Sequence, residues 1–444
     1  MTKLKEVTNT KLKRITALSE QNKDAEFKWL MPHFNSEALK QCYYKLDGGR
    51  AVGIDGQTKE EYGKELDQNI ESLTNKMKGM AYLPKPIRRV QIPKDTNKKE
   101  YRTLGISCFE DKIVQLRTKE ILESIYEPIF LTSSYGFRPG KSCHNAVKDL
   151  KQYIDRNWIN TVIDVDLKNF FDRIDHRKLL DLLSKKIKDR KFLRYISRML
   201  KAGVMTGISE EEKEVGTTQG SVVSPVLANI FAHYVIDEWI ESEIKGKIKG
   251  PIELFRYCDD IVICCPNKNV GNLILNKLED RLELYKLQLN HEKTKMEWFS
   301  RSGMKNYNKK QGTFDFLGFT YYLQYVAPKL VAVGVKTNRK RFRSKLNKVK
   351  LWIKENRHKL RFKQLWDELC IKLKGHLQYY GVSNNHRSIS AFFWQATKAF
   401  FFWINRRSQK KSINWEKFVK FRTRYPLPKI RTCHSLRCNP VAVM

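Results

Sequence analysis

The spacing of hydrophobic and polar residues along the chain predicts a mixture of helices and strands. Apolar residues recur at helical spacing in three early stretches, 35–46, 62–80 and 111–126. Segments in which apolar residues alternate with polar ones or run together, and which therefore predict strands, are 88–94, 101–106, 160–167, 254–265 and 314–325. Beyond residue 336 the pattern is helical, with aromatic residues interleaved among Lys and Arg. The sequence therefore predicts an α+β body followed by a helical C-terminal part.

Turn signals refine this picture at three places. The segment 254–265 is best divided into two short strands that meet at Asp259 and Asp260. The aromatic segment 314–325 is broken by glycine, which indicates a hairpin. Glycines between residues 48 and 56 indicate turns between the first two helices.

The net charge changes the picture from a generic folded chain to one with a polyanionic partner. Hydrophobic residues make up 41% and charged residues 30% of the 444 residues, which is typical of a folded protein. The formal net charge is +37, and residues 335–444 hold 28 Lys and Arg against 4 Asp and Glu, or +24 of that total. Cations placed on phosphates release condensed counterions, so nucleic acid is the favoured partner. The alternatives are an anionic membrane surface and a generally basic surface.

Other bulk features exclude several classes of protein. The sequence contains no run of 18 apolar residues and opens with no signal-peptide hydrophobic stretch, so neither a membrane span nor secretion is expected. Its nine cysteines are scattered and odd in number, which favours a reducing compartment over a disulfide framework. We expect a cytoplasmic, nucleic-acid-associated protein without a membrane partner.

Two apolar strands carry acidic residues where a buried strand normally avoids them. Asp164 and Asp166 lie in the segment 160–167, and Asp259 and Asp260 lie between the two strands of 254–265. A buried carboxylate is costly unless a base or a metal ion neutralises it. If the strands pair side by side, the clustered carboxylates repel one another unless they hold divalent cations, for which Mg²⁺ with its oxygen ligands is suited. For Asp259 and Asp260 alone, the competing interpretation is an ordinary hairpin turn.

Strand alternation does not choose between the two upstream acids. Asp164 and Asp166 lie two residues apart and therefore point to the same face of their strand. Asp172 and Asp175 follow in a predicted turn, where capping or ion pairing is the expected role.

Seven sequence blocks, in order, resemble those of bacterial group II intron reverse transcriptases, which are also called maturases. The blocks are SYGFRPGKS at 134–142, DLKNFFD at 166–172, QGSVVSPVLANI at 219–230, YCDD at 257–260, LNHEKTK at 289–295, FLGF at 316–319 and GHLQYY at 375–380. Together the resemblance covers about 35–428. The chain departs from the family pattern at Cys258, where Ala is usual, at Thr103, where Pro is typical, and at Thr218, where Pro is common.

The resemblance implies an α+β right-hand polymerase. An N-terminal extension and the start of the fingers would occupy 1–60, fingers and an antiparallel-sheet palm 61–334, and a basic helical thumb or maturase domain 335–444. It implies an RNA-directed DNA polymerase that uses two Mg²⁺ ions, with Mn²⁺ as a substitute, an RNA template, a DNA primer and dNTPs. It further implies binding of structured intron RNA to assist splicing and retrohoming.

The resemblance also assigns catalytic and nucleotide-binding roles to residues of this chain. Asp166, Asp259 and Asp260 would be catalytic and bind metal, with Leu167 as a further metal contact. The implied nucleotide contacts are Lys94 and Arg102 on the triphosphate, Phe171 (less favourably Phe170) under the sugar, Gln219 and Gly220 beside the base, and Lys293 as a proton donor to pyrophosphate. For Lys94 and Lys293, an exposed lysine without such a role is the competing interpretation.

Nucleic-acid contacts are expected on cationic surfaces. The resemblance places Arg138 on the template, and the basic start of the C-terminal helices, Arg339, Lys340, Arg341 and Arg343, on RNA. The aromatic residues of those helices are expected to form mainly core. Cys433, His434 and Cys438 are too crowded to favour a zinc site.

Three functional alternatives remain open from the sequence. The chain ends shortly after residue 428, so the resemblance implies the short kind of intron protein that lacks an endonuclease domain. A free-standing reverse transcriptase of the same lineage, acting in phage defence or repair, is the second possibility. The third is an RNA-binding splicing factor with an idle polymerase site, against which the intact acidic residues argue.

Overall fold

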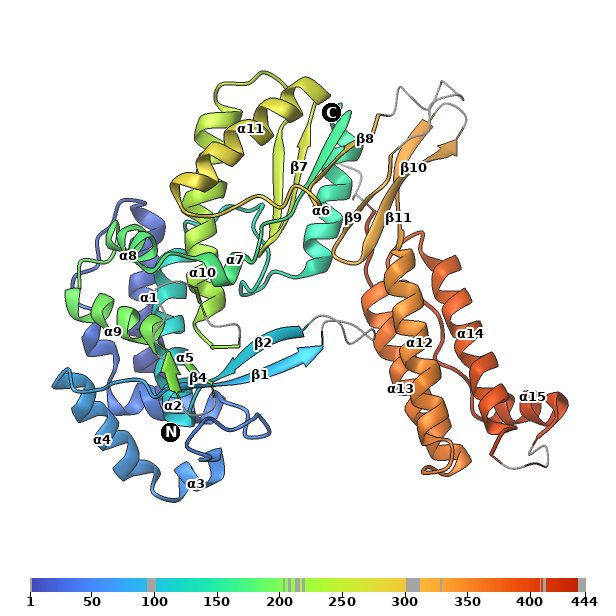
Figure 1. Ribbon diagram of the computed structural model, residues 1–444, viewed down its shortest axis with the longest axis horizontal. Helices are drawn as coiled ribbons and strands as arrows, with labels where there is room; N and C mark the ends of the chain where they lie inside the picture. The colour runs from blue at the N-terminus through green and yellow to red at the C-terminus, as the bar shows by residue number, and fades with distance from the viewer. Residues whose placement is uncertain are drawn as a thin grey trace.

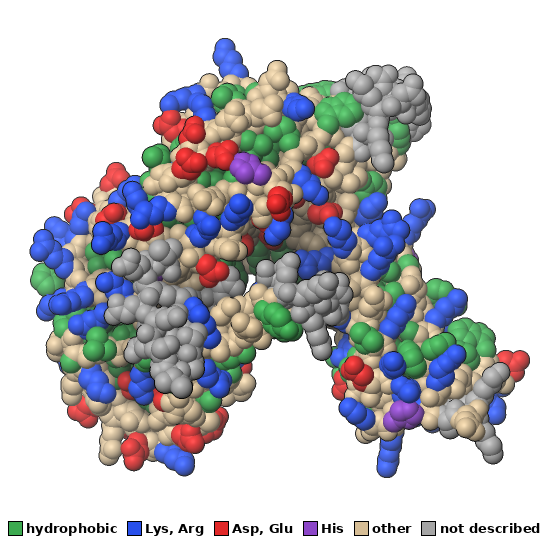
Figure 2. Space-filling view, in the orientation of Figure 1, with side chains coloured by type: hydrophobic (Ala, Val, Ile, Leu, Met, Phe, Trp, Pro, Cys, Tyr) green, Lys and Arg blue, Asp and Glu red, His purple; other side chains and the backbone are tan. Residues whose placement is uncertain are grey.

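The computed structural model of the protein describes residues 2–93, 101–202, 204–206, 209–211, 216–217, 220–300, 312–327, 330–407, 409 and 413–437. Figure 1 shows three groups of elements: an N-terminal group at the left, a sheet flanked by helices at the top, and a group of helices at the right. An open groove separates the left and right groups on the face shown in Figure 2. This arrangement matches the predicted right-hand polymerase, with fingers, palm and thumb in that order.

The N-terminal group combines helices with a small sheet. Its helices are α1 (Thr2–Gln21), η1 (Met31–His33), α2 (Ser36–Lys45), α3 (Lys59–Lys64), α4 (Leu66–Lys78), α5 (Phe109–Tyr126), α8 (His176–Ser184) and α9 (Arg190–Lys201). Its sheet has the order β2-β1-β4-β5, with strands β1 (Ile87–Pro93), β2 (Tyr101–Ile106), β4 (Val204–Thr206) and β5 (Ser209–Glu211). Strands β1 and β2 form an antiparallel pair that projects toward the C-terminal helices (Figure 1).

The central sheet has four antiparallel strands in the order β6-β7-β3-β8. They are β3 (Thr161–Val165), β6 (Glu253–Tyr257), β7 (Asp260–Cys265) and β8 (Lys295–Trp298). Because side chains alternate across a strand, each face has its own core. Ile163 and Ile263 pack on the side of helix α11 (Lys268–Leu284), whereas Val162 and Cys264 pack on the side of α6 (Cys143–Arg156). The sheet is therefore covered on both faces, and only its ends are open for chemistry.

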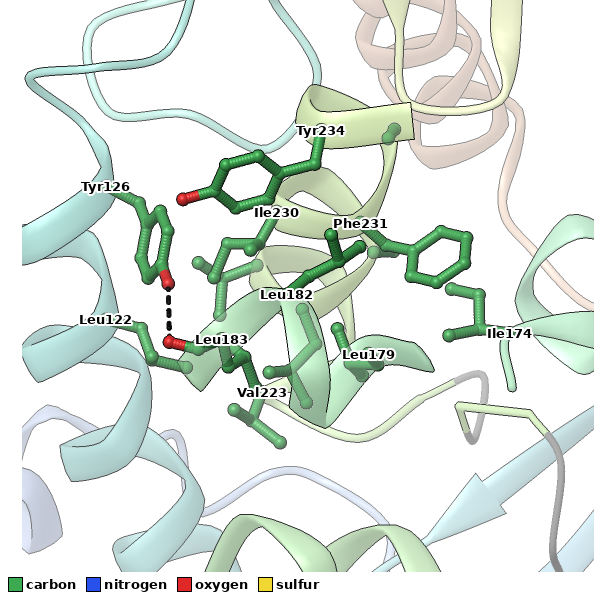
Figure 3. Close-up of a cluster of buried hydrophobic side chains, with 14 of the residues drawn as sticks. Leu122, Tyr126, Ile174, Leu179, Leu182, Leu183, Val223, Ile230, Phe231 and Tyr234 are labelled. Carbon is green, nitrogen blue, oxygen red and sulfur yellow. Dashed lines mark hydrogen bonds between the residues drawn. The ribbon is translucent and has the colours of Figure 1, made fainter. Parts of the chain in front are cut away.

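A buried cluster joins the central sheet to the N-terminal group. It includes α10 (Ser224–Ala232), which continues into the π-helical segments η2 (His233–Asp237) and η3 (Ile240–Lys245). Figure 3 shows apolar side chains from α5, α8, α10 and η2 meeting in this cluster. The Tyr126 hydroxyl donates a hydrogen bond to the Leu183 carbonyl at 3.4 Å, which satisfies its polar end in an otherwise apolar environment (Figure 3).

The C-terminal part begins with a second antiparallel sheet and ends in helices. The sheet has the order β11-β10-β9, with strands β9 (Phe314–Phe316), β10 (Phe319–Ala327) and β11 (Leu330–Thr337). The helices are α12 (Arg339–Asn356), α13 (Phe362–Tyr380), α14 (His386–Ile404) and α15 (Trp415–Arg424). Trp366 lies in their core, and its indole N–H donates to the Tyr425 carbonyl at 3.0 Å. Aromatic residues thus form much of this core, but Trp394 and Trp415 remain exposed.

The structure confirms most elements predicted from the sequence and corrects one. The predicted helix over 62–80 is two helices, α3 and α4, because the backbone of Glu65 leaves the helical conformation between them. Gly63 lies just before this break, against the Tyr43 hydroxyl, where a Cβ would come within 2.1 Å of that oxygen. The predicted domain boundary at residue 334 falls within β11, and the helical part begins at Arg339. Among the described residues, no helix has the length and apolarity needed to cross a membrane.

The packing of α11 on the sheet yields a stability prediction. Leu278 is fully buried, whereas Leu284 on the same helix is 64% exposed. Leu278→Ala should lower the free energy of unfolding by about 2–5 kcal/mol, because it removes buried methyl groups and leaves a cavity. Leu284→Ala should change it by less than about 0.5 kcal/mol. Urea unfolding followed by circular dichroism measures both, and equal midpoints for the two variants would contradict the assigned packing.

Candidate active site

The sheet brings the predicted catalytic carboxylates together at one end. Asp260 is the first residue of β7, and Asp166 directly follows β3, whose last residue Val165 pairs with Ile261. Pairing of Tyr257 with Asp260 closes a two-residue turn that contains Asp259. The three acids therefore converge from two neighbouring strands, as the sequence predicts.

Burial and neighbouring carboxylates raise the pKa values of Asp259, Asp260 and Asp164. Asp259 and Asp260 retain exposed surface, yet the protein around them displaces enough water to disfavour their charged forms. Burial, followed by the charges of Asp259 and Asp166, raises the pKa of Asp260 to about 6. Burial also raises the pKa of Asp259, with a contribution from Asp166. Burial and the charge of Asp260 raise the pKa of Asp164 to about 7. Such a cluster gains stability from any cation that enters it.

The donor set of the cluster fits a divalent cation with hard-oxygen preference. Within the described ranges, no three His, Cys, Asp or Glu side chains already form a complete metal cage. Mg²⁺ is usually held by one or two carboxylates together with waters and substrate phosphates, so an incomplete protein cage is the expected arrangement. Leu167 adjoins Asp166 and pairs with Leu289 in an isolated antiparallel bridge, and its metal contact stays a prediction.

The loop before β8 fixes the position of Asp166. The Asn290 side-chain amide donates to Asp166 Oδ2 at 2.8 Å, and the Asn290 backbone N–H donates to the Asp166 carbonyl, also at 2.8 Å. The Asp166 backbone N–H donates to Thr294 Oγ1 at 3.2 Å. Lys293 Nζ lies 3.9 Å from Asp166 Oδ2. The predicted proton donor thus lies beside the predicted metal ligand, on an exposed side chain.

A buried ion pair that the sequence analysis missed supports the other half of the site. The Arg256 side chain is 0% exposed, and its Nε and one terminal nitrogen donate to the two carboxylate oxygens of Asp237 at 2.7 and 2.6 Å. The same guanidinium donates to Asn229 Oδ1 at 2.9 Å, to Ser134 Oγ at 2.7 Å and to the Cys258 carbonyl at 3.2 Å. Arg256 therefore ties β6, α10, η2 and the loop before α6 to the turn that carries Asp259. A cation inside an apolar strand was the sequence signal that could have revealed it.

Close backbone packing also fixes this turn. Cys258 has φ 62°, which lies in the left-handed region that residues other than glycine rarely adopt. A Cβ on Gly136 would lie 2.5 Å from the Cys258 backbone nitrogen, so only glycine fits there. The Asn229 side-chain amide donates to the Gly136 carbonyl at 2.7 Å. The SYGFRPGKS block therefore supports the YCDD turn from behind.

Residues of the N-terminal group face the carboxylates from one side. Arg102 is exposed on β2, and its positive charge partly offsets the rise in the pKa of Asp259 and of Asp260. Gly220 has φ 110°, and a Cβ there would lie 2.7 Å from the Gly105 carbonyl oxygen of β2. Lys94 and Gln219, two predicted nucleotide contacts, lie outside the described residues.

The two neighbouring phenylalanines after Asp166 have different environments. Phe170 is buried in the core, whereas Phe171 is only partly buried and packs edge-on against it with ring centroids 5.6 Å apart. The backbone carbonyl of Phe171 accepts a hydrogen bond from the Thr217 N–H at 2.7 Å. Of the two, Phe171 is the one with surface left to contact a nucleotide sugar. Asp175 caps α8 and pairs with Lys286 at 2.6 Å, as predicted for that residue.

The structure corrects the template contact expected for Arg138. Its side chain is 6% exposed, and its Nε pairs with Glu127 at 3.0 Å. One terminal nitrogen donates to the carbonyls of Leu131 and Ser134, each at 2.7 Å, and the other donates to the Glu127 carbonyl at 3.4 Å. The guanidinium therefore organises the loop after α5 and is not presented to a template.

The basic start of α12 faces the carboxylates from the opposite side. The four predicted RNA contacts, Arg339, Lys340, Arg341 and Arg343, are all exposed in its first two turns. Cations at a helix N-terminus oppose the helix dipole, so this cluster is poised for an anion. The charge of Arg341 partly offsets the rise in the pKa of Asp260, so the start of α12 interacts electrostatically with the acids. Figure 2 shows Lys and Arg side chains spread over the C-terminal helices on this face.

The crowded Cys-His segment has a structural explanation within the described residues. His434 Nε2 lies 2.9 Å from the Gln378 carbonyl, and its ring stacks on His144 with centroids 3.6 Å apart. Cys433 donates its backbone N–H to the Gly381 carbonyl. Cys438 lies outside the described residues. This segment therefore packs between α6 and α13.

Comparison with known proteins decides the family. A family model described as reverse transcriptase (RNA-dependent DNA polymerase) matches residues 92–321, just over half of the chain. The chain belongs to the reverse transcriptase family. The matched region contains the three converging acids, and members of this family generally use divalent metal ions.

Curated relatives point to reverse transcriptases encoded by introns. The chain is 37% identical over 245 residues to the group II intron-encoded protein LtrA of Lactococcus lactis. This alignment covers 54% of this chain and 40% of LtrA. It is 31% identical over 283 residues to protein YkfC of Escherichia coli, covering 56% of this chain and 73% of YkfC. An uncharacterized 91 kDa protein in the cob intron of Schizosaccharomyces pombe is 42% identical over 185 residues, covering 41% of this chain and 22% of the relative. The match confirms the predicted resemblance, and it spans less than half the length of LtrA.

The Arg256 pair yields a prediction that separates a broken ion pair from a replaced one. Arg256→Met should lower the free energy of unfolding by about 3–5 kcal/mol, because it leaves the Asp237 carboxylate buried without a partner. Adding Asp237→Leu should recover much of this loss, since an apolar pair removes the unpaired charge. Thermal unfolding of both variants measures the difference.

A surface ion pair provides the matched control. Lys363 pairs with Asp367 at 2.7 Å, and both side chains are largely exposed. Lys363→Met should cost about 1 kcal/mol or less. If Arg256→Met is no more destabilising than Lys363→Met, the structural role assigned to Arg256 is wrong.

The raised pKa values predict how stability depends on pH without metal. An aspartate whose folded pKa exceeds its unfolded value of about 3.9 binds its proton more tightly when folded. The contribution of this tighter proton binding to the free energy of unfolding is complete below the unfolded pKa. It is lost as pH rises through about 6 for Asp260 and about 7 for Asp164. In EDTA, Asp164→Asn should therefore raise the unfolding temperature at about pH 8 more than at about pH 5. An equal shift at both pH values would contradict the raised pKa of Asp164.

Proposed function

We propose that the chain is an RNA-directed DNA polymerase that works by two-metal phosphoryl transfer. The observation that carries the proposal is the convergence of Asp166, Asp259 and Asp260 at one end of the central sheet, within a reverse transcriptase family match. Two cations from opposite sides of the site, Arg102 on β2 and Arg341 on α12, interact electrostatically with Asp260. A nucleotide triphosphate with its bound metal ions fits such a site, because the acids bind the metal ions and the arginines bind the phosphate oxygens.

The acidic residues would hold the metal ions. Asp166, Asp259 and Asp260, with the backbone of Leu167, are the proposed ligands. Two Mg²⁺ ions, or Mn²⁺ in their place, would supply Lewis-acid activation of the primer 3′-hydroxyl and charge neutralisation at the leaving pyrophosphate. The hydrogen bonds from Asn290 orient the Asp166 carboxylate, and Arg256 orients the turn of Asp259.

Other residues would bind the nucleotide and manage its proton. Arg102, together with Lys94, would contact the triphosphate. Gly220 and Gln219 would lie beside the base, and a side chain at position 220 would have no room. Lys293, beside Asp166, would donate a proton to the departing pyrophosphate. Phe171, partly buried over core Phe170, would pack under the sugar and exclude a 2′-hydroxyl.

The partners proposed for the whole protein follow from its charge and relatives. The basic helices would hold an RNA template with its DNA primer, through Arg339, Lys340, Arg341 and Arg343. Because LtrA is named as a group II intron-encoded protein, we further propose that the chain binds structured intron RNA and assists its splicing and retrohoming. A cytoplasmic location stays a prediction from the sequence.

Primer extension on an RNA template tests the polymerase directly. The wild type should extend a DNA primer with dNTPs and Mg²⁺ or Mn²⁺. Asp260→Asn should lower the rate by roughly a hundredfold or more, because it removes several kcal/mol of charge stabilisation by metal. Asp280→Asn, an exposed aspartate on α11, removes the same charge away from the site and should leave the rate unchanged.

Two outcomes would contradict this proposal. Equal extension by the wild type and Asp260→Asn would show that the converging acids are not catalytic. No extension by the wild type, with RNA binding retained, would favour an RNA-binding splicing factor instead.

A further inference from the structure

A pocket on the C-terminal helices has the chemistry of a nucleotide site and lies apart from the carboxylates. It has a volume of about 340 Å³ and lies between α12 and α13, with Phe392 of α14 in its wall. This volume is within the range of pockets that bind small molecules, which begins at about 300 Å³. Its lining combines three lysines with aromatic rings and includes no acidic side chain.

The three lysines form a positive cluster in which Lys345 and Lys372 contact aromatic rings. Lys345, Lys348 and Lys372 line the pocket, and within the described part of the chain none of them has a carboxylate within 4.0 Å. Burial, followed by the charges of Arg341 and Lys348, lowers the pKa of Lys345. An anion between these lysines would relieve their repulsion, and a phosphate is the anion that a basic surface of this kind most readily accepts.

Aromatic surface accompanies the lysines in the pocket. Trp352 lines the pocket from α12, and the Lys372 ammonium lies 4.4 Å from its ring centroid. Stacking of a nucleobase on an aromatic side chain is tolerant of base identity and contributes about 1–3 kcal/mol. A base can stack on the part of the Trp352 ring that the Lys372 ammonium does not cover, so the pocket offers aromatic surface beside a cation.

His376 supplies unused hydrogen-bonding groups at the wall of the pocket. It is 5% exposed, and among the described residues neither of its ring nitrogens has a hydrogen-bond partner. Its ring lies parallel to that of Phe392, with centroids 3.6 Å apart. Burial, followed by the charge of Lys345, lowers its pKa to about 3, so the ring is neutral and presents one donor and one acceptor. A buried pair of unused polar groups is costly unless a ligand satisfies it.

A glycine inside helix α13 leaves room at the same place. Gly375 lies in the middle of α13, where glycine costs about 1 kcal/mol relative to alanine. Within the part of the chain that the structure describes, a Cβ built on Gly375 would meet no atom within 4 Å, so no described neighbour requires glycine there. The open space above the helix backbone belongs to the pocket.

We propose that this pocket binds one unpaired nucleotide of a structured RNA. The phosphate would lie among Lys345, Lys348 and Lys372, the base would stack on Trp352, and an edge of the base would satisfy His376. Gly375 would allow the nucleotide to approach the helix backbone. The inference rests on the proposed nucleic-acid function and extends it to a defined subsite.

The pocket lies where a bound strand would reach it. Arg341, Lys345, Lys348 and Trp352 recur at spacings of three or four residues and therefore share one face of α12. Arg341 begins this face near Asp260. From there to Lys348 the helix rises by about 10 Å. A strand held at the start of α12 would thus pass the pocket.

An RNA hairpin with a single bulged nucleotide provides the test. The bulged position carries 4-thiouridine, and a matched hairpin lacks only that nucleotide. We expect the full-length wild type to bind the bulged hairpin about fivefold or more tightly than its match, the equivalent of one stacked base. Irradiation should crosslink the bulge to Trp352 or His376, identified by mass spectrometry.

Matched variants locate the effect. Gly375→Leu should abolish the preference for the bulge because it fills the pocket, whereas Gly375→Ala should keep it. If Gly375→Leu does not fold, His376→Phe keeps the ring stack, removes the polar edge and should weaken the preference. Lys348→Gln should weaken the preference, while Lys420→Gln, an exposed lysine on α15, should lower the affinity for both hairpins equally.

Several results would overturn the inference. They are equal affinity of the wild type for both hairpins, crosslinks outside α12–α14, and a preference retained by Gly375→Leu. If an equimolar amount of AMP abolished the crosslink, the pocket would be a site for free nucleotides and not for a nucleotide of RNA. Primer extension on a short unstructured template is measured in parallel. If extension is active but the bulge is not preferred, the pocket proposal fails and the polymerase proposal is unaffected. If the bulge crosslinks to the pocket but no extension occurs, the polymerase proposal fails and the pocket proposal holds.

Discussion

The buried pair of Arg256 and Asp237 is the interaction on which the arrangement of the active site depends. Removing two ions from water is costly, and such a pair persists only with good geometry and additional hydrogen bonds. Here the guanidinium contacts both Asp237 oxygens and three further acceptors. One of these is the Cys258 carbonyl, at the turn that carries Asp259. The buried Arg256 guanidinium therefore fixes the position of the turn that carries the carboxylates.

This support is needed because the site is built from groups that repel. Burial, with contributions from the neighbouring carboxylates, raises the pKa of Asp259 and of Asp260, and rigid neighbours keep the turn from relaxing to separate these groups. Asn290 holds Asp166, Gly136 packs against Cys258, and Arg256 holds the turn. Arg102 and Arg341 approach from opposite sides of the molecule without forming part of this frame. The result is a concentrated negative charge that is preorganised for cations and phosphates.

Strand chemistry allowed the sequence to predict the acids and much of the fold. Asp166 and Asp260 border apolar strands, and strand pairing leaves few ways to arrange them other than side by side. Capping by Asp175 was likewise predictable, because it uses only local geometry. Helix 62–80 was predicted as one element because the apolar spacing does not reveal the backbone change at Glu65 that separates α3 from α4.

Contacts between distant segments limited the rest of the prediction. Arg138 belongs to a motif that suggested a template contact, but Glu127 and nearby carbonyls engage its guanidinium. Arg256 was visible as a cation in an apolar strand, whereas its partner Asp237 depends on how the π-helical segment η2 turns toward the sheet. The pocket beside His376 exists only where three helices meet, so no single stretch of sequence predicts it.

Mn²⁺ binding to a repacked variant tests most directly whether the Arg256 pair positions the acids. The double variant Arg256→Met/Asp237→Leu keeps an apolar core but loses the hydrogen bond to the turn. Electron paramagnetic resonance would measure Mn²⁺ binding to this variant and the wild type in the presence of primer, template and dNTP. We predict that the folded double variant binds Mn²⁺ about 10–100-fold more weakly, as expected when the support of a metal ligand is removed. Equal affinity in the two proteins, with unchanged circular dichroism, would contradict the account.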